Sequence, residues 1–413
     1  MRVLVLGAGV VGTAAAWYLA EAGHEVTVLD REAGPARGTS YANAGQSLGA
    51  SVQPWVSPAV PGTILRHFGR IDAPYLIHLK PDPAIWGWAV GFLRNCTRAR
   101  VAEITASLKR LAILSLTEIR DLRAELDLHY DMRPGVLHVF SSQKEFDHAA
   151  GAAVREPEAA RPVVHTREEA VALEPALAAR PDLVAGGLHY AQDETGDCHL
   201  FTNRLAERAE EKGVAFHWGE AVEAVIVEGG RATGARAGRR EFRADAVVMS
   251  LATGSAALLR PLGMRVPIYP VKGYAATMPA GPGAPEVALM DRDHKAGITR
   301  LGERLRIAGT AELAGYDPRL DKRRAGALLN IMMKRFPEGG DPSEAELWTG
   351  LRPMTPDCAP LLGECALPGL WLDTGHGSLG WTLACGSARV LAEMVSGRRS
   401  PIDLNGLTLG RFA

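Results

Sequence analysis

The first thirty residues constrain the fold of this chain more than any other segment. An apolar, β-branched run over residues 2–6 leads into a turn that carries Gly7, Gly9 and Gly12. An alanine-rich helical stretch follows, and a second apolar run ends at Asp30. In such a turn the first glycine allows the tight bend, the second lets the backbone approach a pyrophosphate, and the third lets the helix pack on the strand. We therefore predict a βαβ unit that binds an adenine dinucleotide.

The predicted contacts with the dinucleotide come from the turn, the first helical residues and the end of the second strand. They are Gly7, Gly9, Val10, Val11, Gly12, Asp30 and Arg31. The helix N-terminus offers free N–H groups to phosphates, and the terminal carboxylate can accept hydrogen bonds from a ribose. The alternative is a glycine turn that only joins buried elements, but the order of strand, turn, helix, strand and acid favours the binding site.

The composition is typical of a globular protein that acts on small molecules. A chain of 413 residues is too long for one compact core, so we expect two domains. The formal net charge of -1 and the lack of long basic runs argue against a nucleic-acid partner. No apolar run is long enough to span a membrane. The five cysteines are scattered and never spaced as CxxC, which favours reduced thiols in the cytoplasm over disulfides or a metal site.

The segment RGTSYANAGQSLG, residues 37–49, is rich in small and hydrogen-bonding residues and has no helix or strand pattern. We interpret it as a loop that passes beneath the pyrophosphate and reaches the ring system of the cofactor. The residues expected to contact the cofactor are Ser40, Asn43, Ala44, Gly45 and Gln46. The alternative is a solvated loop.

The next part of the chain reads as an insertion that leaves the nucleotide-binding domain. Frequent prolines over residues 51–84 predict irregular structure. Apolar residues at helical spacing over residues 85–126 predict two amphipathic helices, with Trp86, Trp88 and Phe92 in the core. A strand is expected over residues 130–139, and a linker over residues 157–181 with a short helix near residues 167–172.

The chain then returns to an alternation of predicted helices and strands. A helix is predicted over residues 199–212, followed by strands over residues 214–218 and 221–227. In the second of these strands, Val222 is placed to cover the edge of an adenine base. A buried strand then runs into Ala252, Thr253 and Gly254, whose small side chains let the backbone close on the cofactor. Such a late return to the nucleotide sheet is typical of flavin proteins, because more of the chain is needed to enclose their larger ligand than to enclose a nicotinamide cofactor.

The last third combines a second sheet with another strand-turn-helix entry. Residues 266–336 predict antiparallel strands covered by a helix over residues 323–336. Near the C-terminus, Gly375, His376, Gly377, Ser378 and Leu379 precede an alanine-rich helix. The N-terminus of that helix is expected to face the flavin pyrimidine, where negative charge develops on reduction.

The predicted fold class is therefore α/β, with a Rossmann-like FAD-binding domain and an α+β second domain built on an antiparallel sheet. The FAD-binding domain is assigned to residues 1–49, 185–262 and 346–413. The substrate-binding domain is assigned to residues 50–184 and 263–345.

Seven phrases carry a family resemblance: VLGAGVVG, TSYANAGQ, LRNCT, DETGDC, VKGY, LRPMTPD and GHGSLGWTLACGS. They resemble the D-amino-acid oxidase superfamily of flavoproteins, and within it the bacterial D-amino-acid dehydrogenases of the small-subunit type. The resemblance implies non-covalent FAD and the oxidation of a D-amino acid to an imino acid that hydrolyses to a 2-oxo acid and ammonia. It also implies a quinone-type electron acceptor, and hence a cytoplasmic protein that docks at the inner face of the membrane. It leaves the oligomeric state open.

The resemblance also assigns roles to residues. Arg352, in the LRP phrase, is expected to bind the substrate carboxylate, and with Gly350 to lie against the cofactor. Tyr274, in VKGY, is expected to form an aromatic wall or to donate a second hydrogen bond to the carboxylate; the alternative is ordinary strand packing. His376 either assists the amine or polarises a flavin carbonyl, or its phrase serves backbone geometry alone. Hydride transfer to flavin N5 then needs no protein base at the carbon–hydrogen bond.

Two phrases depart from the family pattern. Residues 47–51 read SLGAS where a longer SPGY-like phrase is expected, and residues 291–295 read DRDHK where the family phrase is DExYK-like, so His294 replaces a tyrosine. If these positions line the substrate site, as we expect for His294, the preferred side chain differs from that of an alanine-type enzyme. D-Proline or cis-4-hydroxy-D-proline is then the closest alternative substrate, and glycine or sarcosine a more distant one. A nicotinamide dehydrogenase and a non-catalytic flavin-binding subunit are the competing classes.

Overall fold

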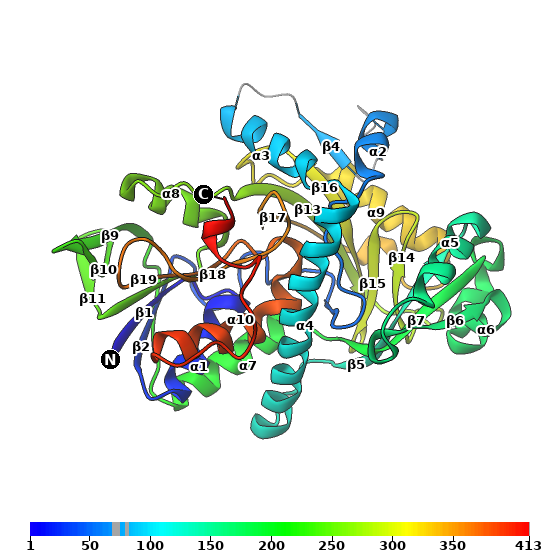
Figure 1. Cartoon of the computed structure of the whole chain (residues 1–413). Coiled ribbons are helices and arrows are strands. Elements are labelled where there is room, and N and C mark those ends of the chain that lie inside the picture. Colours follow the sequence, from blue (N-terminus) through cyan, green and yellow to red (C-terminus); the bar gives the residue numbers. More distant parts are fainter. Residues whose placement is uncertain (68–74, 79–81, 413) are drawn as a thin grey trace.

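The structure, a computed structural model, describes residues 1–67, 75–78 and 82–412. Two large sheets lie next to each other, and the long helix α4 (Arg98–Leu126) runs between them (Figure 1). The element order agrees with the predicted α/β class, with a parallel sheet that starts the chain and a separate, largely antiparallel sheet.

The first sheet has six strands among the described residues and combines strands from the start of the chain with strands from near its end. Its order is β18 (Leu361–Glu364), β19 (Leu370–Thr374), β12 (Ala246–Met249), β1 (Arg2–Leu6), β2 (Glu25–Asp30) and β8 (Ala215–Trp218). All neighbours pair in parallel except β18 and β19. The predicted βαβ unit is confirmed, because β1 and β2 are parallel and joined by α1 (Val10–Glu21).

Helices cover this sheet through closely packed small residues. The helix α1 packs against α10 (Gly380–Val395) and α7 (Cys198–Glu211), and α10 packs in turn against α4. A β-carbon at Gly386 of α10 would lie 2.8 Å from the carbonyl oxygen of Leu111, so α10 and α4 approach at backbone distance. A small antiparallel sheet of β9 (Val222–Glu228), β10 (Arg231–Ala237) and β11 (Arg240–Arg243) lies at the outer edge (Figure 1).

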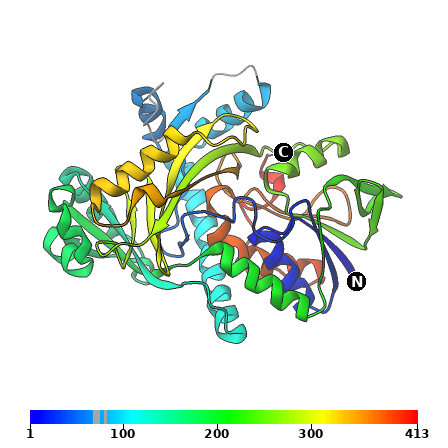
Figure 2. The ribbon, with the colours of Figure 1, turned by 180° about the vertical axis from the view of Figure 1, so that it is seen from behind.

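The second sheet has ten strands among the described residues and is mostly antiparallel. Its main path is β17 (Glu346–Met354), β13 (Tyr269–Pro279), β16 (Arg304–Leu313), β15 (Ala296–Leu301), β14 (Ala288–Asp291), β5 (Arg133–Phe140), β7 (Gly186–Thr195) and β3 (Gln46–Ser47). The strands β4 (Tyr75–Ile77) and β6 (Val163–Thr166) pair with β16 and β7. The helix α9 (Lys322–Arg335) lies across one face of this sheet, as Figure 2 shows from behind.

Shorter helices complete the fold. They are α2 (Val60–His67), α3 (Pro83–Arg94), α5 (Gln143–Ala153), α6 (Arg167–Leu173) and α8 (Ser255–Leu259). The two helices predicted over residues 85–126 and the short helix near residue 167 are confirmed as α3, α4 and α6. None of the helices in the described ranges is both long and apolar enough to cross a bilayer.

Several local predictions were wrong. Residues 51–84 are not uniformly irregular, because they contain α2 and β4; residues 68–74 and 79–81 of this stretch lie outside the described residues. Pro61 is tolerated because it falls in the first turn of α2, where a backbone N–H has no intrahelical partner. The linker contains β6, and the loop at residues 37–49 ends in β3. Trp88 and Phe92 are buried as expected, but Trp86 is 54% exposed.

The assignment of the chain to two domains stays a prediction. The strands β7 and β17 fall in ranges assigned to FAD binding, yet both pair within the ten-stranded sheet. These ranges therefore contribute to both sheets, and they bring residues of the second sheet up to the glycine-rich turn of the first.

Candidate active site

A cavity of about 420 Å³ is lined by residues of both large sheets. It collects most of the residues that the sequence singled out. The predicted residues that line it are Gly9, Val10, Val11, Ser40, Asn43, Ala44, Gly45, Gln46, Ala252, Tyr274, Gly350, Arg352, Gly375, His376, Gly377, Ser378 and Leu379. Those that do not line it are Gly7, Gly12, Asp30, Arg31, Val222, Thr253, Gly254 and His294.

The glycine turn is built as its sequence predicts. Gly7 has a φ of +104°, and a β-carbon there would lie 2.7 Å from the carbonyl oxygen of Ser250. A β-carbon at Gly12 would lie 1.9 Å from the carbonyl oxygen of Gly7, so the helix can begin only if this residue is glycine. Gly9, in contrast, faces the cavity, and its nearest neighbour would be the Ser40 hydroxyl at 3.4 Å. Two glycines thus shape the turn and the third leaves room beside it.

The side chain of Asp30 accepts two hydrogen bonds from the backbone in this structure. Its Oδ2 accepts a hydrogen bond from the backbone N–H of Ala8 at 2.6 Å, and its Oδ1 accepts one from Glu32. The carboxylate therefore holds the glycine turn against the end of β2. A ribose contact by Asp30 stays a prediction, as does a contact by its neighbour Arg31, whose side chain is 77% exposed.

The loop of residues 40–47 is held in place from three directions. The Asn43 side chain accepts from the N–H of Gly45 at 2.9 Å, and the Thr299 hydroxyl donates to the carbonyl of Ala44 at 2.8 Å. Arg306 of β16 donates to the carbonyl of Asn43 at 3.4 Å. This network fixes the shape of the loop before any ligand binds.

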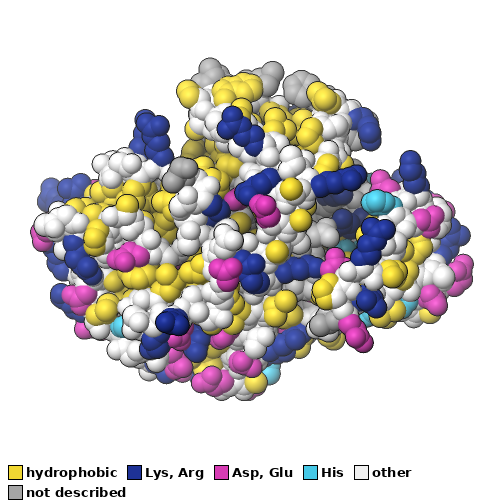
Figure 3. Space-filling model, in the orientation of Figure 1, with side chains coloured by type: hydrophobic (Ala, Val, Ile, Leu, Met, Phe, Trp, Pro, Cys, Tyr) yellow, Lys and Arg dark blue, Asp and Glu magenta, His cyan; other side chains and the backbone are white. Residues whose placement is uncertain are grey.

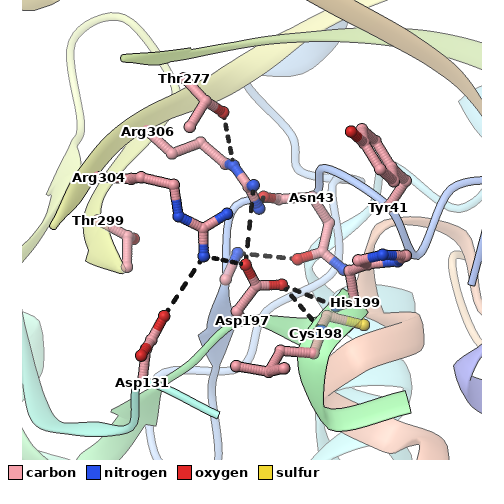
Figure 4. A network of polar contacts seen from close by, with 12 residues as sticks. Tyr41, Asn43, Asp131, Asp197, Cys198, His199, Thr277, Thr299, Arg304 and Arg306 are labelled. Atoms are coloured by element: carbon pink, nitrogen blue, oxygen red, sulfur yellow. Dashed lines mark hydrogen bonds and ion pairs between the residues drawn. The ribbon is translucent and has the colours of Figure 1, made fainter. Parts of the chain in front are cut away.

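Asp197 connects that loop to the helix α7. Figure 4 shows Arg304 and Arg306 converging on its carboxylate, with Nη2 of Arg304 at 2.8 Å and Nη2 of Arg306 at 4.0 Å. The same carboxylate accepts from the first N–H groups of α7, at His199 and Leu200, and so caps this helix. The DETGDC phrase thus acts mainly by positioning the cofactor-side loop.

Buried polar atoms without a hydrogen-bond partner are concentrated at the cavity. Among the described residues, those with such side-chain atoms that line it are Gln46, His138, Ser250, Thr310, Asp373 and Trp381. Buried polar groups in proteins are nearly always hydrogen-bonded. This set of donors and acceptors, next to the room at Gly9, fits a long polar ligand such as a dinucleotide.

His376 is held by its own helix and strand. Its Nε2 lies 3.1 Å from the Ser387 hydroxyl of α10 and 3.3 Å from Oδ1 of Asp373 at the end of β19. Its backbone forms a bridge with Met354. The imidazole is 3% exposed although its residue lines the cavity. The roles suggested for His376 toward the amine or the flavin therefore stay predictions, while its part in fixing the turn before α10 is visible.

Arg352 extends from β17 across the neighbouring strand. A β-carbon at Gly273 of β13 would lie 2.1 Å from Nη1 of Arg352, so the guanidinium rests directly on the β13 backbone. Nη1 donates to the carbonyl of Thr310 at 2.8 Å, and Nη2 donates to that of Gly309 at 3.4 Å. The indole of Trp55 lies 5.2 Å from Cζ. Among the residues that the structure describes, the remaining N–H groups of the fork have no acceptor and can bind an anion.

The charge of Arg352 has no counterion in the described part of the chain, where no carboxylate forms an ion pair with it. Burial lowers the pKa of Arg352 to about 10. A buried guanidinium without an anionic partner is costly, and a carboxylate ligand would offset that cost.

A β-bulge positions the carbonyls that hold Arg352. The register between β13 and β16 shifts between Lys272 and Tyr274, so β16 has an extra residue there. Thr310, in this bulge, has a φ of +55°, which a β-branched residue rarely adopts. Such strain persists where the surroundings require it, often at functional sites.

Tyr274 is almost fully buried and belongs to the apolar cluster that β13 forms with α9. Its hydroxyl donates to Oε2 of Glu312 at 2.5 Å, and burial together with this bond raises the pKa of Tyr274. Its one proton is therefore used within the protein. The guanidinium of Arg352 lies on the other face of β13, over Gly273, so both roles suggested for Tyr274 stay predictions.

His294 is not brought to the cavity, contrary to expectation. Its side chain is 44% exposed, and its Nδ1 lies 3.0 Å from Oδ1 of Asp291, which raises the pKa of His294. Asp291 also accepts from Arg335 at 2.9 Å. Residues of one turn point in different directions, and the neighbours Arg292 and Lys295 line the cavity instead.

Sequence reasoning missed other lining residues, among them Trp55, Thr310, Asp373, Arg292 and Lys295. Trp55 lies in the proline-rich stretch that carried no site signal. The conformation of Thr310 depends on strand register, which a single sequence does not display. Asp373 alone had a signal, since an acid in an otherwise apolar buried strand needs a reason.

This chain belongs to the FAD dependent oxidoreductase (DAO) family, whose sequence model matches residues 2–394. It is 46% identical over 417 residues to the D-amino acid dehydrogenase of Paramagnetospirillum magneticum, with 100% of this chain and 99% of that protein covered. It is 43% identical to the D-amino acid dehydrogenase of Bradyrhizobium diazoefficiens over the same shares of the two chains. These findings confirm the resemblance seen in the seven phrases.

Solved structures confirm the fold. Glycine oxidase from Bacillus cereus superposes with a TM-score of 0.73 at 20% identity, covering 96% of this chain and 95% of that one. L-Proline dehydrogenase from P. horikoshii superposes with a TM-score of 0.75 at 17% identity, covering 100% and 97%. Family membership and the cavity agree that FAD is the cofactor, with the pyrophosphate expected at the turn around Gly9.

Proposed function

We propose that this protein oxidises D-amino acids at the α-carbon and that the resulting imino acid hydrolyses to a 2-oxo acid and ammonia. The observation that carries the proposal is the guanidinium of Arg352, which is buried in the FAD cavity without a counterion among the described residues. An α-carboxylate is the anion that every amino acid offers. The relatives named D-amino acid dehydrogenase, at up to 46% identity over the full chain, support the choice of substrate class.

The roles of the chain's own residues follow from their positions. The fork of Arg352 binds both oxygens of the carboxylate and thereby fixes the rotation of the substrate. Trp55 excludes water on one side of that contact. The carbonyls of Gly309 and Thr310 hold the fork in place. Bound FAD supplies the two-electron acceptor, so no protein base is needed at the α-carbon.

The test is anaerobic bleaching of the flavin by a panel of D- and L-amino acids, D-proline, cis-4-hydroxy-D-proline, glycine and sarcosine. Bleaching by several D-amino acids is expected. Bleaching by cyclic imino acids alone would shift the assignment to them, and no bleaching by any compound would refute turnover on amino acids.

Arg352→Ala and Arg352→Lys test the carboxylate contact. Loss of a charge-assisted contact costs about 1.5–3 kcal/mol, so kcat/KM should fall roughly 10- to 150-fold in Arg352→Ala, largely through KM. Arg352→Lys keeps the charge without the fork, so its kcat/KM should lie between that of the wild type and that of Arg352→Ala. Unchanged kinetics in Arg352→Ala would remove this residue from the substrate site.

We further propose that a quinone-type acceptor takes the electrons and that the protein docks on the inner face of the cytoplasmic membrane. The support is an apolar surface, the α2–α3 face, formed by Leu65, Trp86, Val90 and Leu93, which are 79%, 54%, 48% and 47% exposed. Hydrophobic side chains gather at the top of Figure 3, where Figure 1 places α2, α3 and β4. Exposed arginines, Arg66 and Arg94, accompany them and suit anionic headgroups.

The α2–α3 face also adjoins the cavity. Val60 and Thr63 of α2 line the cavity, while Leu65 of the same helix is exposed. A lipid-soluble acceptor could thus approach the cofactor from the bilayer side.

Vesicle co-sedimentation tests this docking surface. The variant Leu65→Glu/Trp86→Glu should lose binding to vesicles of phosphatidylglycerol and phosphatidylethanolamine and should reduce a soluble dye at the wild-type rate. The control is Ile113→Glu, which places the same charge at a 56% exposed position on α4 and should bind as the wild type does. Equal binding by all three proteins would refute the assignment of this face.

A further inference from the structure

The cavity holds a second group of cations, at the turn between β14 and β15. Arg292 and Lys295 of this turn line the same cavity as Arg352. They come from the phrase DRDHK, in which acids and bases alternate over most of the length. The two acids and the two bases of this turn have different surroundings.

The acids of the turn are bound to other groups. Asp291 accepts from Arg335 at 2.9 Å and contacts His294 at 3.0 Å. Asp293 accepts from the backbone N–H of Ser141 at 2.9 Å. Neither carboxylate forms an ion pair with the bases that face the cavity.

The bases of the turn are not bound. In the residues that the structure describes, the guanidinium of Arg292 and the ammonium of Lys295 make no hydrogen bond and no ion pair. Burial lowers the pKa of Arg292, and burial together with the charge of Arg292 lowers the pKa of Lys295. Two neighbouring cations that form no ion pair with the described residues therefore face the cavity, which Asp291 lines as well.

The groups around these bases do not neutralise them. Tyr75 of β4, His138 of β5 and Tyr190 of β7 are near Arg292, and burial lowers the pKa of His138 well below its usual value, so its ring is neutral. The one acid that faces the pair from another element of the described chain is Glu145 of α5, which forms no ion pair with either base.

The turn lies at a suitable distance from Arg352. Arg352 donates to carbonyls on β16, and β15 and β14 are the next two strands of the sheet. Ala296, which follows Lys295, pairs with Gly309, one of the residues whose carbonyl holds Arg352. Adjacent strands are about 5 Å apart, so the turn begins roughly 5–10 Å from the carboxylate-binding fork. Long side chains on both sides shorten the gap that a ligand must span.

We propose that Arg292 and Lys295 form a second anion subsite, which binds the side-chain carboxylate of an acidic substrate. This inference rests on the proposed function and narrows it: the preferred substrates are D-glutamate and D-aspartate. Arg352 binds the α-carboxylate, and the turn binds the distal one. The same cations reject D-lysine and D-arginine, because a like charge would be brought into a poorly solvated cavity.

The first experiment compares acidic substrates with their neutral amides in the holoenzyme. For the wild type, kcat/KM for D-glutamate should exceed that for D-glutamine about 10-fold or more. Arg292→Gln should lower the D-glutamate value by about 10- to 100-fold and leave D-glutamine and D-alanine within about threefold. Lys295→Gln is the second variant and should act in the same direction. The control is Arg323→Gln, which changes a 74% exposed arginine of α9 and should change none of these values.

The second experiment needs no turnover. Perturbation of the flavin absorbance measures the affinity of glutarate, which has two carboxylates, and of butyrate, which has one. Glutarate should bind at least 10-fold more tightly to the wild type, and Arg292→Gln should remove this difference.

The outcomes separate the subsite from the proposed function. Oxidation of D-glutamine and D-glutamate with equal kcat/KM would overturn the subsite and leave the oxidation of D-amino acids intact. Tighter binding of glutarate that depends on Arg292, without oxidation of any D-amino acid, would support the subsite and refute the proposed function. Equal binding of glutarate and butyrate would overturn the subsite in either case.

Discussion

The substitution Gly273→Ala tests how the site is built, because it leaves every presumed functional side chain in the sequence. A β-carbon at this position would lie 2.1, 2.3 and 2.4 Å from Nη1, Cζ and Nη2 of Arg352. No atom pair of this kind can approach so closely. The clash involves the far end of a flexible side chain, so the guanidinium moves and the strand stays. Alanine in a strand is otherwise favourable by roughly 0.5–1 kcal/mol relative to glycine.

The expected result is an enzyme that folds normally and binds substrate poorly. Displacement of the fork breaks its 2.8 Å bond with the carbonyl of Thr310 and removes the charge-assisted contact with the substrate. A contact of this kind contributes about 1.5–3 kcal/mol, so kcat/KM should fall roughly 10- to 150-fold, mainly through KM. The assay is steady-state dye reduction with D-amino acids, alongside thermal unfolding and flavin content, both of which should match the wild type.

Gly326→Ala is the matched control, because a β-carbon at this position of α9 would meet nothing within 4 Å. It should leave kcat/KM unchanged. The reasoning fails if Gly273→Ala keeps kcat/KM within threefold of the wild type, since the substrate would then not depend on the position of Arg352. It also fails if the loss appears in kcat alone with an unchanged KM.

Three further predictions concern the cofactor side and the acid stability. Gly9→Val should yield protein without bound flavin, since a branched side chain would fill the space between the turn and Ser40; a variant with full flavin content would show that the turn does not bind the pyrophosphate. Asp373→Leu removes buried oxygens that accept no hydrogen bond from the described protein and should weaken FAD binding at least 10-fold in equilibrium dialysis, whereas unchanged affinity would place this acid outside the cofactor site. Burial by itself raises the pKa of Asp291, but its hydrogen-bond partners hold it at about 2, below the unfolded value. Its contribution to stability is therefore present above pH 4 and is lost as the pH falls toward 2, so urea unfolding of the wild type and Asp291→Asn should differ by about 1 kcal/mol less at pH 3 than at pH 6. A constant difference between the two pH values would contradict the assigned contacts of Asp291 with His294 and Arg335.

The local sequence predicted those parts of this protein in which the interacting residues all lie within one short segment. The glycine turn is such a segment, because the carbonyl that excludes a side chain at Gly12 belongs to Gly7, five residues earlier. The helices α3 and α4 followed from apolar residues at helical spacing. The segment around α2 was misjudged, because prolines were counted without regard to their position in the first turn.

Among the residues that line the cavity, the sequence predicted those of two loops most completely. Residues 40–46 and 375–379 reach the cavity because each follows a strand that ends at that edge of a sheet. On the substrate side, the phrase around Arg352 pointed to a residue that lines the cavity, but nothing in the sequence gave its surroundings. His294 was chosen from the DRDHK turn, whereas its neighbours Arg292 and Lys295 face the cavity. In a tight turn adjacent side chains diverge, and only the coordinates show which way each one points.

By itself, therefore, the sequence determined a βαβ unit, a late return to the same sheet and a buried arginine in a recognisable phrase. Tertiary structure decided what surrounds that arginine. The bulge at Thr310, the backbone of Gly273 beneath the fork and the indole of Trp55 come from segments more than forty residues away in the chain. Such contacts depend on which residues of neighbouring strands pair and on which face each side chain takes. A shift of one residue in register would change the pairs and turn each side chain to the other face.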